Sequence, residues 1–438
     1  MISLFKTRFY MRAIGFCLFI FVFFSNIPAF SADATLTLAQ AQTIALTRSR
    51  QLASQDSFVY SSQEMALAAG QLPDPVLKLG IDNLPVNGAD RFSLTDDFMT
   101  MRRISVMQEL TSSDKRQART QLYERAADKA RSEKTVIIAE IQRDTALAWL
   151  DRYYAEKMVS TIKEQIAENR LEIQAAQSAY RAGSSTQSDV LSARTALALM
   201  EDRASEIQLK SSNAKTALAR WIGNSADIAP DDLPAIDTIR LHLTPLESEL
   251  KSELDHHPKV AVANQQIILA EADAKLAQAN KNTDWSIGLA YQQRASAYSN
   301  MISIEVSIPI QWDQKNRQNR ELHAKQAIVE QMIAERDEIV RQQLAETRTI
   351  FNEWQNDRDR IQRFELELLP LAHQRIQAVF AAYRGGKADL LALLAARRDE
   401  VDVRLQLLQL QNATARLWAQ LNFITPTESI TAMNKELP

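Results

Sequence analysis

The chain carries the same helical pattern twice, and this internal repeat constrains the fold more than any other feature. The motif Ala179-Tyr180-Arg181-Ala182-Gly183 recurs 203 residues later (180 to 383) as Ala382-Tyr383-Arg384-Gly385-Gly386. After each copy, small or apolar residues recur at alternating spacings of four and three, the a/d pattern of a coiled-coil seam. The first seam comprises Ala193, Leu197, Met200, Ala204, Ile207, Ser211, Ala214, Leu218 and Trp221. The same offset gives Ala396, Glu400, Val403, Leu407, Leu410, Thr414, Leu417, Leu421 and Ile424, among which Glu400 is the one misfit.

A long helical stretch precedes each motif. The first runs from about Asp114 to Arg181 without a glycine or proline, and the second runs from about Asp313 to Arg384. The second contains Pro370, which removes a helical hydrogen bond and is expected to kink the helix. At ~1.5 Å per residue each stretch would reach on the order of 100 Å. The whole chain of 438 residues has only 9 glycines and 12 prolines. We therefore expect two long helical hairpins with tips near Gly183 and Gly386.

The N-terminal residues 1–31 have the features of a secretory signal peptide. Lys6, Arg8 and Arg12 precede a short apolar core, and Ala29-Phe30-Ser31 supplies small residues for cleavage. The alternative is a membrane anchor, for which the apolar core is short. The only cysteine of the sequence, Cys17, lies within this segment, so the mature chain is expected to have no disulfide.

Four short segments alternate with a period of two instead of the helical period. They span about 75–84, 100–110, 284–292 and 301–310. In the last of them, Ile302, Ile304 and Val306 alternate with Ser303 and Glu305, as in a membrane β-strand with one apolar and one polar face. The alternative is two soluble hairpins packed on the helices. Four strands cannot close a barrel, whereas three copies would supply twelve.

The expected fold is mainly α with membrane β, in two tandem structural repeats. It is a trimeric 12-stranded β-barrel, with four strands per protomer, continuous with a long α-helical coiled-coil barrel. The expected domains are the signal peptide (1–31), repeat one (32–232), repeat two (233–424) and a flexible tail (425–438).

Charge and residue content exclude several classes of function. The chain has 51 Lys and Arg against 54 Asp and Glu, without the basic excess of a nucleic-acid-binding protein. Paired catalytic carboxylates, a nucleophile with its base and a phosphate-binding glycine loop are not visible, so we expect no enzyme and no cofactor. No metal site is expected either, because the adjacent His256 and His257 would not face each other on a helix and the other histidines stand alone.

Together, the signal peptide, the tandem repeat and the two tip motifs resemble the TolC family of outer-membrane efflux proteins. The resemblance covers nearly the whole mature chain. Three further segments resemble the heavy-metal branch of that family, the cobalt–zinc–cadmium and copper–silver exit ducts. They are Leu72-Pro73-Asp74-Pro75, Asp82-Asn83-Leu84-Pro85 and Phe98-Met99-Thr100-Met101.

The resemblance implies a homotrimer whose barrel contacts outer-membrane lipid and whose helical tunnel extends through the periplasm. It also implies that the tunnel tip docks onto a periplasmic adaptor, which links it to an inner-membrane pump of the RND type. The candidate docking and gate residues lie at the two tips. They are Tyr180, Arg181, Gly183, Asp189, Tyr383, Arg384, Gly385, Gly386 and Asp389.

The chain departs from the family pattern in two respects. By the offset of 203 residues, Asp189 matches Ala392 and not Asp389. The two aspartates are therefore not equivalent in the repeat, which argues against a regular acidic ring at the entrance. The mature chain also lacks the N-terminal lipid-bearing cysteine of many relatives.

Two other functions compete with a metal exit duct. One is the same duct exporting drugs or proteins, and the other is a soluble periplasmic coiled-coil scaffold or adaptor.

Overall fold

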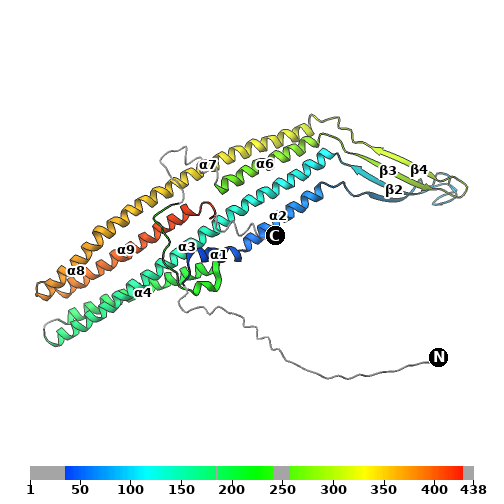
Figure 1. The fold of residues 1–438 in the computed structure, drawn as a ribbon. Coiled ribbons are helices and arrows are strands. Elements are labelled where there is room, and N and C mark those ends of the chain that lie inside the picture. Colours follow the sequence, from blue (N-terminus) through cyan, green and yellow to red (C-terminus); the bar gives the residue numbers. More distant parts are fainter. Residues whose placement is uncertain (1–34, 184–185, 240–256, 428–438) are drawn as a thin grey trace, which may run out of the picture.

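The computed structural model describes residues 35–183, 186–239 and 257–427. The expected signal peptide (1–31) lies outside these ranges, as do residues 428–438 of the expected tail. The described part is elongated (Figure 1). Its strands lie at one end, and the tips of two helical hairpins lie at the other.

Both halves of the chain follow the same order of helix, two strands, long helix, tip and returning helix. This order confirms the tandem repeat, while the exact boundaries at 232 and 424 stay predictions. The first half comprises α1 (Leu38–Arg48), α2 (Arg50–Ala69), β1 (Val76–Asp82), β2 (Met101–Leu110), α3 (Ser113–Arg181), α4 (Gln187–Ile222) and the 3₁₀ turn η1 (Gly223–Asp227). The second half comprises α6 (Pro258–Ala279), β3 (Trp285–Gln293), β4 (Met301–Ser307), α7 (Gln318–Arg363), the π-helix η2 (Phe364–Leu368), α8 (Leu369–Arg384) and α9 (Leu390–Asn422).

The first long helix forms as expected, because nothing in its sequence interrupts it. α3 is 69 residues long and begins at Ser113, one residue before the predicted start. The Ser112 side chain accepts a hydrogen bond from the Lys115 N–H at 3.3 Å and so caps the first turn.

The second long helix differs from the prediction. It begins at Gln318 instead of Asp313, and η2 divides it into α7 and α8 where a single kinked helix was expected. Pro370 has no N–H, and in a regular helix its ring would press on the carbonyl of Leu366. The wider turn of η2, in which the Leu369 N–H donates to the Phe364 carbonyl, accommodates this proline just before it enters α8.

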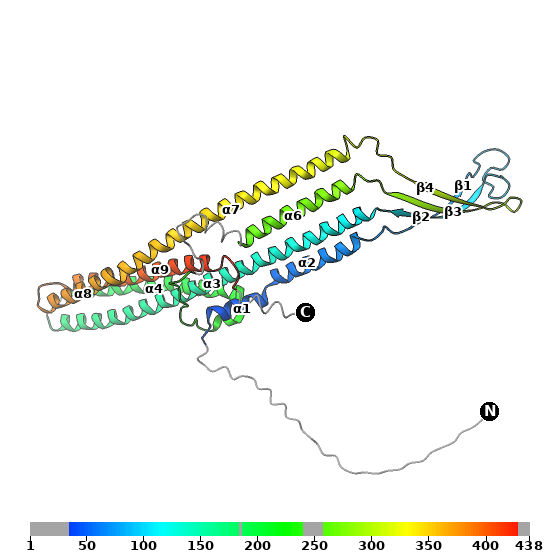
Figure 2. The same ribbon diagram turned by 45° about the horizontal axis from the view of Figure 1, so that its top comes forward.

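The four strands form one antiparallel sheet in the order β1-β2-β3-β4. The central pair, β2 with β3, joins the two halves of the chain. All four predicted strands are present, although β4 ends at Ser307 instead of 310, before Pro309, which cannot donate to a ladder. Helices α2, α3, α6 and α7 lie side by side, and each is joined directly to one strand, β1, β2, β3 and β4 in the same order (Figure 2).

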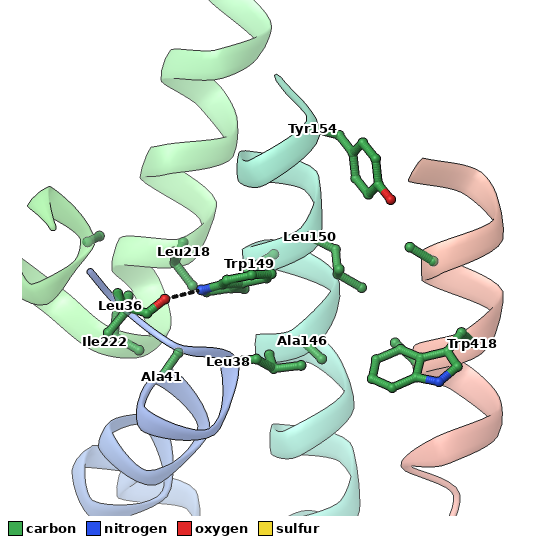
Figure 3. Packing of buried hydrophobic residues seen from close by; sticks show 14 of the residues in the cluster. Leu36, Leu38, Ala41, Ala146, Trp149, Leu150, Tyr154, Leu218, Ile222 and Trp418 are labelled. Carbon is green, nitrogen blue, oxygen red and sulfur yellow. Dashed lines mark hydrogen bonds between the residues drawn. The ribbon is translucent and has the colours of Figure 1, made fainter. Parts of the chain in front are cut away.

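The main core lies midway along the molecule, where α1, α3, α4 and α9 meet (Figure 3). Trp149 of α3 is fully buried there, and its indole N–H donates to the Leu36 carbonyl at 2.9 Å. Leu36 in turn pairs with the segment that follows η1, because its N–H donates to the Ala229 carbonyl at 2.8 Å. The connection between the two repeats is therefore packed against this core along its described length.

The predicted coiled-coil seams are confirmed in both returning helices. Every predicted position of α4 and α9 is buried or half-buried. The apparent misfit, Glu400, keeps the register too, at only 5% exposure. Its carboxylate accepts a hydrogen bond from Arg404 at 2.8 Å and lies 3.4 Å from the His373 ring, so the buried charge is compensated by neighbours.

Candidate functional site

The sheet has two chemically different faces, and the apolar one is open to solvent in the single chain. Ile304 is 75% exposed and Leu79 is 72% exposed. The register places these side chains in continuous rows across all four strands. The exposed apolar set is Leu77, Leu79, Ile81, Ile104, Val106, Ile287, Leu289, Tyr291, Ile302, Ile304 and Val306. A contiguous apolar surface of this kind indicates contact with lipid or with another protein.

The opposite face of the sheet carries mainly small, polar and charged side chains, together with Val76, Met101, Met107 and Met301. Its centre is Arg103 of β2, whose guanidinium lies 3.7 Å from the Asp82 carboxylate and 3.5 Å from the Glu305 carboxylate. On the neighbouring pair of strands, the Gln292 side-chain amide donates to the Ser303 hydroxyl at 3.1 Å. A sheet with one apolar and one polar face suits a wall between lipid and water.

A buried ion pair fixes the junction between the helices and the sheet. The Lys115 ammonium, in the first turn of α3, lies 2.6 Å from the Asp284 carboxylate just before β3. The same ammonium donates to the Asn282 carbonyl at 3.1 Å. Because both side chains are largely buried, the contact holds the second half of the chain against the start of α3.

The two hairpin tips share one turn geometry, in which a single glycine has a positive φ. Gly183 has φ +76° and Gly386 has φ +68°. In the second tip, the Gly386 N–H donates to the Tyr383 carbonyl at 3.0 Å and the Lys387 N–H donates to the Ala382 carbonyl at 2.8 Å. This is the Schellman pattern that ends a helix with a left-handed residue. The glycines that sequence analysis singled out at 183 and 386 are therefore required by the backbone.

The two tip aspartates both serve the first turns of the returning helices. Asp389 is the N-cap of α9 and accepts from the Ala392 N–H at 2.8 Å. Thr186 is the N-cap of α4 and accepts from the Asp189 N–H at 3.2 Å, while Asp189 accepts from the Thr186 N–H at 2.8 Å. The shift noted in the sequence thus has a structural reason, because Asp389 occupies the repeat position of Thr186.

The structure brings all the candidate tip residues to one end of the molecule. Tyr180 is 48% exposed, and Tyr383 packs at the edge of a small core between the two hairpins. The Arg384 guanidinium lies 5.9 Å from the Phe380 ring centre. Arg181 is exposed at the end of α3. A role for these residues in closing the entrance concerns neighbouring copies of the chain and stays a prediction.

Sequence reasoning missed the ion pairs that tie the two hairpins together. Arg397 of α9 lies 2.7 Å from Glu168 and 2.5 Å from Glu172, both on α3. Arg203 of α4 pairs with Asp402 of α9. Burial raises the pKa of the Glu172 carboxyl, and the nearby Arg397 opposes that shift. The charged residues beside the a/d positions are the sequence feature that could have predicted these ion pairs, since such positions commonly form ion pairs between helices.

The described residues contain no helix that is long and apolar enough to cross a bilayer. Within the same ranges, no three His, Cys, Asp or Glu side chains converge as the ligands of a metal ion. Of the five histidines of the sequence, His242 and His256 lie outside the described residues. His257 caps α6, and its Nδ1 accepts from the Lys259 N–H at 3.1 Å.

Residues 59–224 and 250–425 match the family described as outer membrane efflux protein. The cobalt-zinc-cadmium resistance protein CzcC of Cupriavidus metallidurans is 23% identical over 392 residues, covering 88% of this chain and 89% of that relative. Among solved structures, CusC matches with a TM-score of 0.75 at 15% identity, covering 89% of this chain and 92% of CusC. VceC of Vibrio cholerae matches with a TM-score of 0.68 at 19% identity, covering 88% and 95% respectively.

Proposed function

Because this chain belongs to the outer membrane efflux protein family, we propose that three copies form a passive exit duct for heavy-metal cations across the outer membrane. In this proposal the four strands of each copy join a closed barrel, and the helical hairpins form a tunnel through the periplasm. The hairpin tips dock onto a periplasmic adaptor, which connects the duct to an inner-membrane pump of the RND type.

The observation that carries the proposal is the two-faced sheet with its exposed apolar surface. A membrane barrel needs such a face toward lipid, with exposed side chains such as Ile304 and Leu79 in place. In the single chain, β1 and β4 are edge strands, and an open edge is not tolerated in lipid. Three copies would pair these edges and close twelve strands, an even number within the known range of membrane barrels.

No chemical step is needed for this function. The polar face of the sheet lines a water-filled path, which lowers the barrier for a charged solute to pass the membrane. The partner pump supplies the energy. The duct itself has only to close at rest and to bind its adaptor, and both tasks fall on the hairpin tips.

The choice of heavy-metal cations rests on the similarity to CzcC, whose name records cobalt, zinc and cadmium resistance. Drugs or secreted proteins remain the competing cargo. A deletion strain exposed to metal salts and to a panel of drugs decides between them. Sensitivity to the divalent metals alone supports the proposal, whereas sensitivity to drugs alone refutes the metal cargo.

Single cysteines on adjacent residues of β4 test the barrel. Cys17 is the only cysteine of the sequence, and it lies in the expected signal peptide. With Ile304→Cys in lipid and Ser303→Cys in the water path, a small water-soluble maleimide should label only Ser303→Cys in isolated outer membranes. Equal labelling of both positions, or recovery of the chain in the soluble periplasmic fraction, would refute the duct and favour a scaffold.

A further inference from the structure

A single arginine spans most of the polar face of the sheet. Arg103 lies on β2, yet its guanidinium pairs with Asp82 on the neighbouring strand β1 and with Glu305 on β4, two strands away. To reach Glu305 the side chain has to cross β3. One cation thus joins carboxylates from both halves of the chain on the face that would line the water path.

Small residues on β3 make this crossing possible. Gly288 and Ala290 are the β3 residues on the polar face between β2 and Glu305. Ala290 is only 3% exposed and Ser105 only 8%, although both lie on an open sheet. Longer side chains therefore cover them, and a crevice of about 30 Å³ lined by Lys78, Arg103 and Glu305 together with these small residues marks the place.

The charges of this face nearly cancel, and Arg103 is decisive for the balance. The strands place Lys78 and Arg103 on the polar face, together with the carboxylates of Asp82, Glu109 and Glu305. Two cations against three carboxylates leave one negative charge per chain. Without Arg103 the surplus would double to two negative charges per chain.

We propose that Arg103 sets the charge selectivity of the membrane section of the duct, by neutralising Asp82 and Glu305 where they face the water path. This inference rests on the proposed function, because it needs the polar face to line a channel. Rings of like charge control ion selectivity in pores. Charges within about 10 Å of a passing ion act on it at 0.1 M salt, and the range grows as the salt is diluted. Each Arg103 therefore reduces the attraction of the wall for cations.

Removal of Arg103 should leave the fold intact. Its guanidinium and both partner carboxylates are a third or more exposed, and exposed ion pairs contribute only about 0–1 kcal/mol each. Arg103→Gln keeps much of the length of the side chain and removes the charge. The adjacent Arg102 provides a matched control, since it lies on the same strand but on the opposite face of the sheet.

The experiment measures reversal potentials of the purified full-length protein in planar bilayers, under a gradient of dilute KCl. For Arg103→Gln we expect the permeability ratio of K⁺ over Cl⁻ to rise by about two-fold or more. For Arg102→Gln we expect the wild-type ratio. The double variant Asp82→Asn with Glu305→Gln should shift the ratio in the opposite direction, because it leaves the arginine unneutralised.

The outcomes separate this inference from the proposed function. If the wild type forms channels and Arg103→Gln keeps the wild-type ratio, or if Arg102→Gln shifts the ratio equally, the role of Arg103 is wrong while the duct stands. If the wild-type protein is recovered in the soluble periplasmic fraction, the duct itself is wrong and the inference falls with it.

Discussion

The two adjacent glycines at the second hairpin tip should respond in opposite ways to the same substitution. Gly386 has φ +68°, a conformation that costs an L-residue about 1–2 kcal/mol. Gly385 has φ −85°, and its repeat counterpart Ala182 adopts φ −82° with an alanine side chain. Gly386→Ala should therefore strain the turn, whereas Gly385→Ala should not.

The magnitude follows from these two conformations. A Cβ at Gly386 would meet no atom within 4 Å, so the whole cost is backbone strain and not a clash. A Cβ at Gly385 would lie 3.5 Å from the Ala381 carbonyl oxygen, an ordinary contact. Gly386→Ala should destabilise the turn by about 1–2 kcal/mol. Gly385→Ala should stabilise it by about 0.4–1 kcal/mol, because alanine restricts the unfolded chain.

Amide hydrogen exchange of the tip peptide measures the effect where it occurs. The Gly386 and Lys387 amides donate the two hydrogen bonds of the turn, so their exchange reports its opening. In Gly386→Ala their exchange should accelerate about 5- to 30-fold, since 1.4 kcal/mol corresponds to a factor of ten. In Gly385→Ala it should stay the same or slow down. Equal exchange in the two variants would refute the assignment of the left-handed position to residue 386.

Three further predictions follow from charged groups away from the sheet. Burial and the nearby Lys259 charge lower the pKa of His257 to about 4 from 6.5. His257 therefore contributes about 3 kcal/mol of stability above pH 6.5, and this contribution is lost as the pH falls to 4, which lowers the thermal midpoint. His257→Asn keeps a good N-cap and should make the thermal midpoint less dependent on pH in this range. Burial raises the pKa of the Glu172 carboxyl above 4.5, so the folded state holds this proton more tightly than the unfolded state does. The free energy of unfolding therefore decreases as the pH rises above 4.5. Glu172→Gln should remove that decrease, and an unchanged slope of the free energy of unfolding against pH would contradict the prediction. Arg384→Ala and Asp389→Ser each remove a tip charge, while serine retains the N-cap of α9. If these charges hold neighbouring hairpins shut, both variants should change the resting single-channel conductance and its voltage response. Wild-type conductance and voltage response in both variants would refute the gate hypothesis.

Local periodicity explains how much of the fold could be predicted. A heptad pattern depends only on residues three and four apart, so the seams of α4 and α9 were readable along the chain. The alternation of Ile302, Ile304 and Val306 with polar residues likewise determined a two-faced strand. The repeated glycine at 183 and 386 determined where each hairpin turns, because left-handed backbone conformations favour glycine.

Contacts between segments far apart in the chain needed the tertiary structure. No sequence pattern places Arg397 against Glu168 and Glu172, since that contact depends on how one hairpin lies beside the other. The reach of Arg103 to Glu305 depends on a strand order that brings both halves of the chain into one sheet. Glu400 looked like a break in the seam, because a buried carboxylate is unfavourable without partners. The structure shows that Arg404 and His373 lie beside it, which makes the charge acceptable in this buried position. Sequence alone therefore determined each element and the side of it that is apolar, whereas packing decided which charges meet.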